Sequence, residues 1–480
     1  MDNLKKQTTN SFAWNFADKV GYQVIALVVG LITLRLLSPT DFGYTGALAV
    51  FTMLSNILVE SGFTAALIRR KNNTERDYTA AFWFNIALSV ALYLILYFSA
   101  GAIATYFKME PLRDLARILF LAIIFNSFTI VQYIILQKEL KFKQLTIADL
   151  TGMIVSAIIT IWMAMDGWGY WALAAQQISQ VAVKAILLWV MSPWRPVSIR
   201  WGDLKIIKEI FSFSALLILS SAITTVVKYI YTIFIGPRYS TDQVGYYSQA
   251  YKYHQIPYSV ISQSISGVAY PVLSSLNDER ERQMSYIHRI MKMTAFFTLP
   301  VMAGFYAVGD NFVHVIITDK WLPMLPYLRL LLIAGTMMPF ITQYLGLLNV
   351  FGKPNLYFVC EFVRNLLVIG LLLVMNDSIT EILYGFIIAT AVAFVGMSVL
   401  ISWVTHYRII DQVRHIVPPT LLALTMGVVV YFLPRFVVCV SWLQLLLQLT
   451  VGVAVYMGLA WIFRMEVLMN IKETIRHRNA

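Results

Sequence analysis

The segment Ser38-Pro39-Thr40-Asp41-Phe42-Gly43-Tyr44 separates two apolar stretches, near residues 12–37 and 42–68. A helix needs about 20 apolar residues to cross roughly 30 Å of hydrocarbon. Serine, proline and aspartate in a short connection favour a turn between two such helices. The segment therefore predicts a hairpin of two transmembrane helices.

The same pattern continues along the whole chain of 480 residues, of which 59% are hydrophobic and only 13% are charged. Soluble domains are nearer half apolar and a quarter charged, so a soluble enzyme is excluded. The sequence predicts an all-α integral membrane protein with about fourteen transmembrane helices. These spans lie near 12–37, 42–68, 79–106, 112–136, 145–165, 169–191, 207–235, 244–273, 289–309, 325–350, 356–375, 379–404, 417–433 and 442–463.

The first hairpin has a counterpart after the seventh span, in Ser240-Thr241-Asp242-Gln243-Val244-Gly245-Tyr246. Six spans separate the two segments, so both halves have the same orientation in the membrane, as in a parallel repeat. We expect two six-helix lobes, residues 1–200 (spans one to six) and 201–410 (spans seven to twelve). Residues 411–480 then supply two additional spans and a cytoplasmic tail.

Basic residues fix the expected orientation. With both termini in the cytoplasm, 23 Lys and Arg residues fall in cytoplasmic segments and five in outer segments. This asymmetry follows the positive-inside rule and supports both the even number of helices and this orientation. We expect a multi-pass protein of the plasma (inner) membrane. It also accounts for the net charge of +12 without a nucleic-acid partner.

Ionisable and polar residues recur within the spans, although a charge at the middle of the bilayer costs about 2.5–3.5 kcal/mol. The in-span charges are predominantly basic, nine against four. Span eight carries a polar stripe at helical spacing, formed by Ser248, Lys252, Gln255, Ser259, Ser262, Ser266 and Tyr270. Shorter polar faces occur in spans one, two, six and seven. Such faces either bond neighbouring helices or line a hydrated cavity, and a basic cavity favours an anionic substrate.

Other chemistry has little support in the sequence. The two cysteines and six histidines show no metal-ligand spacing, and no catalytic constellation is visible. Gly346 and Gly352-Lys353-Pro354 depart from an ATP-binding loop in both spacing and final residue. We expect no metal and no cofactor, apart from a possible coupling ion, H⁺ or Na⁺.

Several strings together resemble the Wzx-type lipid-linked oligosaccharide flippases, in the branch of colanic-acid and teichuronic-acid exporters. This group belongs to the multidrug/oligosaccharidyl-lipid/polysaccharide (MOP) superfamily. The resemblance covers most of residues 10–375 and is carried by Arg35-Leu36-Leu37-Ser38-Pro39-Thr40-Asp41-Phe42-Gly43, Glu60-Ser61-Gly62-Phe63, Gln137-Lys138-Glu139-Leu140, Trp171-Ala172-Leu173-Ala174, Ser192-Pro193-Trp194-Arg195-Pro196 and Gly245-Tyr246-Tyr247-Ser248-Gln249. It implies alternating-access export of undecaprenyl-pyrophosphate-linked repeat units for surface polysaccharides such as lipopolysaccharide. It also implies a central cationic cavity and a polysaccharide polymerase as a possible partner.

Within this resemblance, nine residues form the hypothesised site. The charges expected opposite the pyrophosphate are Lys19, Lys228 and Lys252. Polar residues expected to contact the substrate are Gln255, Ser259, Tyr22 and Tyr231. Asp18 and Glu60 either pair with the lysines or bind the coupling cation, and both alternatives stay open.

Two other functions remain as alternatives. A cation-coupled drug or metabolite exporter of the same superfamily would need a more acidic cavity. An integral-membrane polysaccharide polymerase or glycosyltransferase would need a large outer loop, whereas the longest expected outer loop runs only from about residue 310 to 324.

Overall fold

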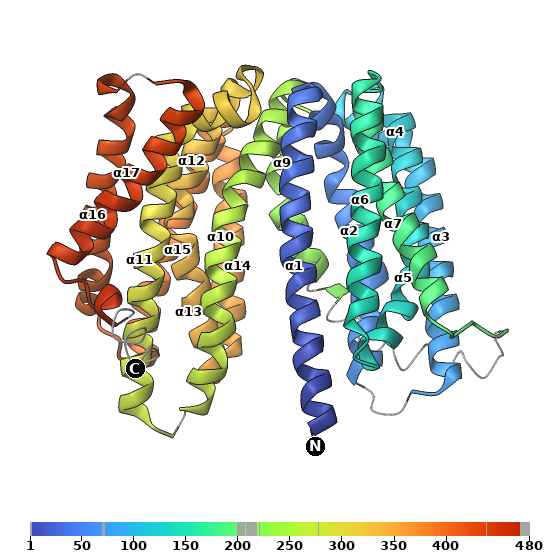
Figure 1. Ribbon diagram of the computed structural model, residues 1–480, viewed down its shortest axis with the longest axis horizontal. Helices are drawn as coiled ribbons and strands as arrows, with labels where there is room; N and C mark the ends of the chain where they lie inside the picture. The colour runs from blue at the N-terminus through green and yellow to red at the C-terminus, as the bar shows by residue number, and fades with distance from the viewer. Residues whose placement is uncertain are drawn as a thin grey trace. The chain divides into compact units, whose positions relative to one another are not determined.

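The computed structural model describes residues 2–69, 73–198, 207, 218–219, 221–276, 278–437 and 439–470. Every regular element in these ranges is helical, as Figure 1 shows. The predicted all-α class is therefore confirmed. Helices satisfy their backbone hydrogen bonds internally, which is a requirement for crossing hydrocarbon.

The chain divides into two compact units, residues 1–248 and 249–480. The first unit contains α1 (Asp2–Leu36), α2 (Pro39–Arg69), α3 (Glu75–Phe107), α4 (Leu112–Leu119), α5 (Leu121–Lys138), α6 (Phe142–Met165), α7 (Tyr170–Met191) and α9 (Ile230–Ile235). The boundary falls within α10 (Thr241–Ser275). The second unit continues with α11 (Arg280–Phe312), a π-helix (Val313–Ile317), a 3₁₀ helix (Asp319–Met324), α12 (Leu325–Gly335), α13 (Met338–Val350), α14 (Pro354–Val374), α15 (Ile379–Thr405), α16 (Ile409–Phe436) and α17 (Ser441–Ile462). The expected subdivision at residues 200 and 410 stays a prediction.

Twelve helical segments of the described chain are long and apolar enough to cross a membrane. Each corresponds to one of the fourteen expected spans. The expected eighth span is α10, which has 35 residues but carries the polar stripe that lowers its hydropathy. Eleven of the 29 residues of the expected seventh span, 207–235, lie outside the described residues, namely 208–217 and 220. The count of fourteen therefore stays a prediction.

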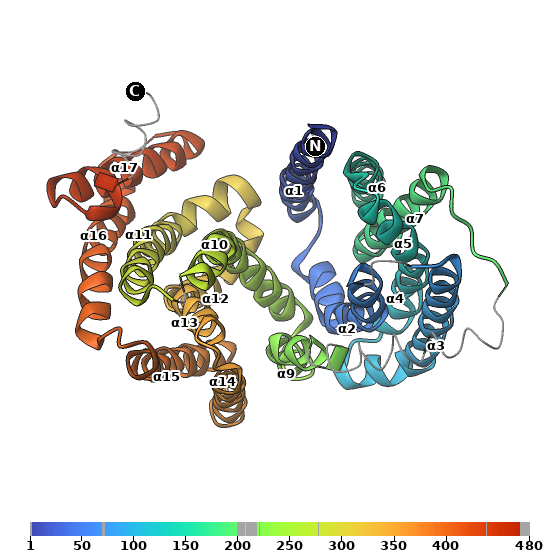
Figure 2. The ribbon, with the colours of Figure 1, turned by 90° about the horizontal axis from the view of Figure 1, so that it is seen from below.

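In the first unit, α6 packs on both α1 and α7 (Figure 2). Helix α5 packs on α2, α3 and α7. Local signals fix the ends of these helices. Thr74 and Asp77 form a capping box at the start of α3, in which the backbone N–H of Thr74 donates to Asp77 Oδ2 at 2.8 Å.

In the second unit, α11 packs on α16 and α17, and α15 packs on α12, α13 and α14. Buried polar side chains tie these helices together. Tyr344 donates to Gln412 Oε1 at 2.8 Å, and Tyr456 donates to the carbonyl oxygen of Phe296 at 2.9 Å. The two C-terminal helices thus belong to the packed core of this unit.

The two repeated segments found in the sequence meet inside the first unit. A methyl group at Gly43 would overlap the carbonyl oxygen of Thr241, and one at Gly245 would overlap that of Pro39. The contact is reciprocal, because Thr241 and Pro39 occupy equivalent positions of the two segments. Thr40 also donates a hydrogen bond to Asp242. Glycine is therefore required at both positions for the N-terminal turns of α2 and α10 to approach each other.

We predict that Gly43→Ala and Gly245→Ala each destabilise the fold by about 1–3 kcal/mol, since a backbone carbonyl must move to admit the methyl group. Thermal unfolding of the detergent-solubilised protein would show a lower midpoint for both variants. Gly101→Ala is the matched control in α3, because a Cβ added there would meet no neighbouring element of the described chain within 4 Å. An unchanged midpoint for Gly43→Ala would contradict the close contact.

Candidate functional site

An ion pair joins α6 to α7 within the membrane-spanning part of the first unit. Lys184 Nζ lies 2.5 Å from Asp149 Oδ1, and the two side chains are only 25% and 16% exposed. The Lys184 ammonium also lies 4.9 Å from the centre of the Tyr133 ring of α5. Gly152 permits this approach, because a Cβ there would lie 2.8 Å from the carbonyl oxygen of Gln180. The pair thus depends on a small residue one turn away.

Helix α1 brings Asp18 to this ion pair. Asp18 interacts electrostatically with Asp149, Lys184 and the adjacent Lys19. Its Oδ1 atom is buried and has no hydrogen-bond partner among the described residues. A buried carboxylate oxygen without a donor is costly, so this atom is a natural position for a proton or a cation.

Helix α2 contributes Glu60 from the other side. Asn126 of α5 donates to Glu60 Oε1 at 2.5 Å, and the same amide lies 3.4 Å from Asn56 Oδ1. Glu60 also interacts electrostatically with Lys184 and Tyr133. We call Asp18, Glu60, Tyr133, Asp149 and Lys184 the intramembrane charge cluster.

The cluster is acidic, with three carboxylates around one ammonium group and Lys19 at its edge. This balance differs from the basic in-span total in the sequence. The carboxylates do not converge on one point, since no group of three His, Cys, Asp or Glu residues in the described chain could hold a metal ion. The arrangement suits proton exchange or a singly charged cation better than a multivalent metal.

The predicted site residues of the first unit fall into three environments. Tyr22 of α1 accepts a hydrogen bond from Gln180 Nε2 at 3.3 Å, which places it beside the cluster. Lys19 and Lys228 are exposed on the unit's surface, and Lys228 Nζ lies 5.9 Å from the centre of the Tyr229 ring. Tyr231 of α9 is buried. The structure therefore gathers Asp18, Glu60 and Tyr22, with Lys19 at the edge.

The predicted residues of the second unit lie on α10. Lys252 is exposed and Gln255 is half-buried, while the half-buried Ser259 donates to the carbonyl oxygen of Ile256 in its own helix at 3.0 Å. Part of the polar stripe bonds a neighbouring helix, because Gln343 of α13 donates to Ser266 at 3.1 Å. The stripe thus serves both helix packing and the surface of the unit.

Asp149, Lys184, Tyr133 and Asn126 are absent from the predicted site, although the first two are ionisable residues within the expected spans 145–165 and 169–191. One signal could have paired them. The turn at Asp166-Gly167-Trp168 joins two antiparallel spans, and Asp149 and Lys184 are nearly equidistant from it along the chain. Residues equidistant from such a turn lie at similar depth, since each advances 1.5 Å along its helix.

These features define a polytopic helical membrane protein that holds ionisable groups inside its bundle, as membrane transporters do. Residues 32–326, more than half of the chain, match the family described as "Polysaccharide biosynthesis protein", and the chain belongs to this family. The family resemblance drawn from the sequence is confirmed.

Relatives and solved structures agree with this placement. The chain is 27% identical over 442 residues to the teichuronic acid biosynthesis protein TuaB of Bacillus subtilis (strain 168), covering 90% of both chains. It is 23% identical over 479 residues to the succinoglycan biosynthesis transport protein ExoT of Rhizobium meliloti (strain 1021), covering 98% of this chain and 96% of that one. The fold is similar to that of the lipid II flippase MurJ in an inward closed conformation. That match has a TM-score of 0.74 at 18% identity and covers 95% of this chain and all of the other.

We predict that Lys184→Met destabilises the protein by roughly 3 kcal/mol, because it leaves the Asp149 carboxylate buried without its partner. Adding Asp149→Asn should restore most of the loss. Thermal unfolding of both variants in detergent measures the difference.

A control for this cycle is Lys141→Met, which removes one partner of an exposed pair. Lys141 Nζ lies 2.7 Å from Glu139 Oε2, with side chains 43% and 44% exposed. The change should cost less than about 1 kcal/mol. Equal losses in Lys184→Met and in the double variant would argue against a coupled buried pair.

Proposed function

We propose that this protein translocates a lipid-linked oligosaccharide across the plasma membrane for the synthesis of a surface polysaccharide, by alternating access. The observation that carries the proposal is the intramembrane charge cluster in a membrane-spanning member of a polysaccharide biosynthesis family. Ionisable groups inside a bundle mark the path of a substrate, an ion or a proton. The names of TuaB, ExoT and MurJ support the same substrate class.

In this proposal, opposite charges have separate tasks. The exposed lysines Lys19, Lys228 and Lys252 attract the pyrophosphate of the carrier lipid, and Gln255 and Ser259 offer hydrogen bonds to sugar hydroxyls. The carboxylates of the charge cluster exchange a proton or bind a singly charged cation. Asp18 and Glu60 are the residues assigned to this step, because Asp149 is the carboxylate that pairs directly with Lys184.

The direction of transport in this proposal is the one that the family resemblance implies. The substrate is collected at the cytoplasmic leaflet and released at the outer leaflet. An inside-negative potential favours outward movement of an anionic headgroup by about 2.3 kcal/mol per charge per 100 mV. The protein then needs no catalytic residues of its own, and a polysaccharide polymerase would consume its product.

A cation-coupled drug or metabolite exporter is the second candidate. One observation favours it, namely the acidic balance of the charge cluster, which also suits a cationic substrate. It predicts that deletion of the gene sensitises cells to cationic compounds without altering surface polysaccharide. Growth tests with such compounds distinguish it from the first proposal.

We predict that a deletion strain accumulates lipid-linked oligosaccharide whose sugars face the cytoplasm. Labelling the sugars of intact spheroplasts from outside, and comparing them with lysed cells, measures this orientation. The gene on a plasmid should restore outer labelling. Intermediates that already face outward but stay unpolymerised would contradict the flippase proposal. They would indicate an enzyme that acts after translocation.

We predict that Lys228→Ala combined with Lys252→Ala lowers surface polysaccharide at least about tenfold, since removal of two charges weakens attraction of the pyrophosphate. The control is Lys108→Ala, which removes an exposed lysine just after α3. Membrane abundance of all variants is compared by immunoblot. A wild-type amount of surface polysaccharide in the double variant would show that these lysines do not belong to the substrate site.

A further inference from the structure

The second unit holds a buried histidine whose polar atoms have no partners. His254 of α10 is completely buried, and neither Nδ1 nor Nε2 has a hydrogen-bond partner among the described residues. A neutral imidazole has one donor and one acceptor, and leaving both unpaired in a protein interior costs free energy. No charged side chain of the described chain acts electrostatically on the ring. His254 therefore does not serve stability alone, and a buried polar group of this kind indicates a functional role.

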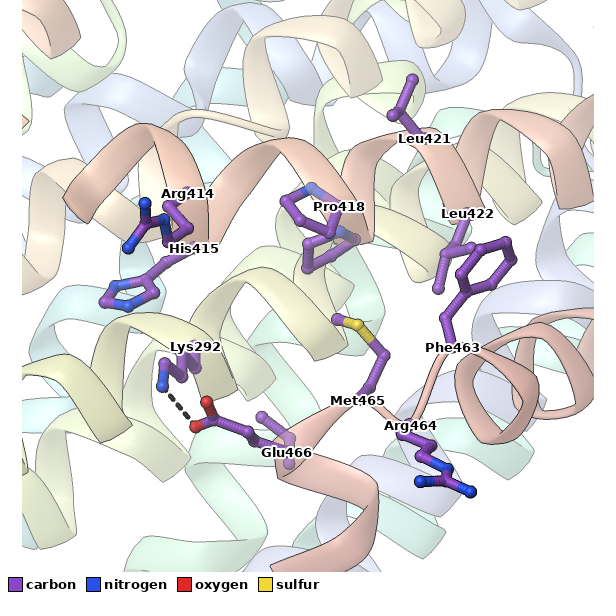
Figure 3. A pocket seen from close by; sticks show the side chains of 12 residues that line it. Lys292, Arg414, His415, Pro418, Leu421, Leu422, Phe463, Arg464, Met465 and Glu466 are labelled. Carbon is purple, nitrogen blue, oxygen red and sulfur yellow. Dashed lines mark hydrogen bonds and ion pairs between the residues drawn. The ribbon is translucent and has the colours of Figure 1, made fainter. Parts of the chain in front are cut away.

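His415 of α16 shows how the same unit accommodates a histidine that has partners. The Tyr407 hydroxyl lies 2.6 Å from His415 Nδ1. The His415 ring also lines a cavity of about 430 Å³, together with the Lys292–Glu466 ion pair (Figure 3). His415 can thus exchange a proton through this cavity while the helices stay in place. His254 has no exposed surface, so it can take up a proton only if its surroundings move.

The His254 ring packs against a break in a neighbouring span. Helix α12 ends at Gly335 and α13 begins at Met338, so residues 336 and 337 interrupt the expected tenth span, 325–350. A Cβ added to Gly335 would lie 2.9 Å from His254 Nε2. Pro339 also lacks the N–H that the carbonyl oxygen of Gly335 would accept in a continuous helix. The imidazole therefore contacts backbone that regular helical hydrogen bonding does not hold.

Helix α10 has an interruption of its own beside His254. Pro257 lies inside α10 and lacks the N–H that would bond the carbonyl oxygen of Tyr253. The Tyr258 ring lies parallel to the imidazole, with ring centres 6.3 Å apart, and its hydroxyl lies 3.1 Å from Thr342 Oγ1 of α13. Helix α10 thus touches both sides of the break, α12 through His254 and α13 through Tyr258. Two weakened helix backbones meet at the histidine, which is the arrangement expected of a hinge.

The groups around the ring determine which charge state the closed contact accepts. The titratable side chains that face it are Tyr251 and Tyr258, both on α10. Helices α11, α12 and α13 supply the Met302 thioether, the Gly335 backbone and the Thr342 hydroxyl to this contact, and none of these groups is charged. An imidazolium would bury two N–H donors and a positive charge without a carboxylate, which is far more costly than burying the neutral ring. The closed contact therefore holds only neutral His254.

We propose that His254 is a proton-binding site that opens the contact between α10 and the α12–α13 break when the ring is protonated. Separation of the helices gives the N–H groups access to water and to the carbonyl oxygens at the break. A hydrated imidazole titrates at about pH 6.5. Because the proton binds only the open form, acidification below this pH shifts the equilibrium toward that form, whereas the closed contact persists above it. The site belongs to the second unit and depends neither on the substrate nor on the charge cluster of the first unit.

The test follows hydrogen–deuterium exchange of the purified full-length protein in detergent at pH 7.5 and 5.5, corrected for the intrinsic effect of pH on exchange. Peptides covering residues 251–258 and 333–340 report on the two sides of the contact, apart from the segment that contains His415. The population of the open form should rise about tenfold between these pH values in the wild type. His254→Phe keeps an aromatic ring and His254→Gln keeps a polar group, but neither titrates, so neither should show the rise.

His406→Asn is the matched control, because His406 is an exposed histidine of the same unit. Its backbone is left-handed, with a φ of 64°, and asparagine tolerates this conformation. This variant should retain the tenfold rise. Absence of the rise in the wild type would overturn the proposal, and so would a rise that persists in the His254 variants. His254→Gln decides alone if His254→Phe does not fold.

Discussion

Hydrocarbon offers no hydrogen bonds, and this constraint shapes every polar feature of the protein. Backbone groups are satisfied inside helices, and hydroxyl groups bond back to their own helix, as when Thr160 donates to the carbonyl oxygen of Ser156 at 2.6 Å. Longer polar side chains must find partners on neighbouring helices. Lys184 finds Asp149, and Asn126 finds Glu60. Because each partner comes from another helix, the polar contacts and the helix packing determine one another.

Small residues make those partnerships possible. Without a hydrophobic driving force between helices, membrane proteins rely on close backbone approach. Gly152 brings α6 near enough to α7 for the Asp149–Lys184 pair to close, and Gly43 and Gly245 bring the two repeated segments together. The ion pair therefore depends on the glycine, since a bulkier residue at Gly152 would separate Asp149 from Lys184 as well as α6 from α7.

Apolar length and turn residues predicted the helical class and the positions of the spans, because membrane thickness dictates both. Helix α10 was expected as the eighth apolar span, near residues 244–273, although its polar stripe leaves it outside the twelve helices that are apolar enough to cross a membrane by hydropathy alone. The partners of Asp18 and Glu60 could not be predicted in this way. They depend on which helices touch, and a periodic pattern gives the face of a helix but not its neighbour. The count of in-span charges could not predict an acidic cluster either, because nine basic and four acidic residues are summed over all the spans. Packing gathers three of those four acids around Lys184.

The gathering of acids has a consequence for how transport would be coupled. A carboxylate beside a pyrophosphate would repel it by several kcal/mol, since two unit charges 4 Å apart interact by about 4 kcal/mol at an effective dielectric constant of 20. An acidic cluster is thus poorly suited to hold the substrate's phosphates and well suited to hold a proton or cation. Lys19 directly follows Asp18 in α1 and interacts with its charge. Neutralising Asp18 would raise the positive potential at Lys19 and strengthen its attraction for phosphate, whereas ionising Asp18 would weaken it. Binding of a proton or a cation at Asp18 would therefore increase the affinity of the adjacent Lys19 for an anionic headgroup.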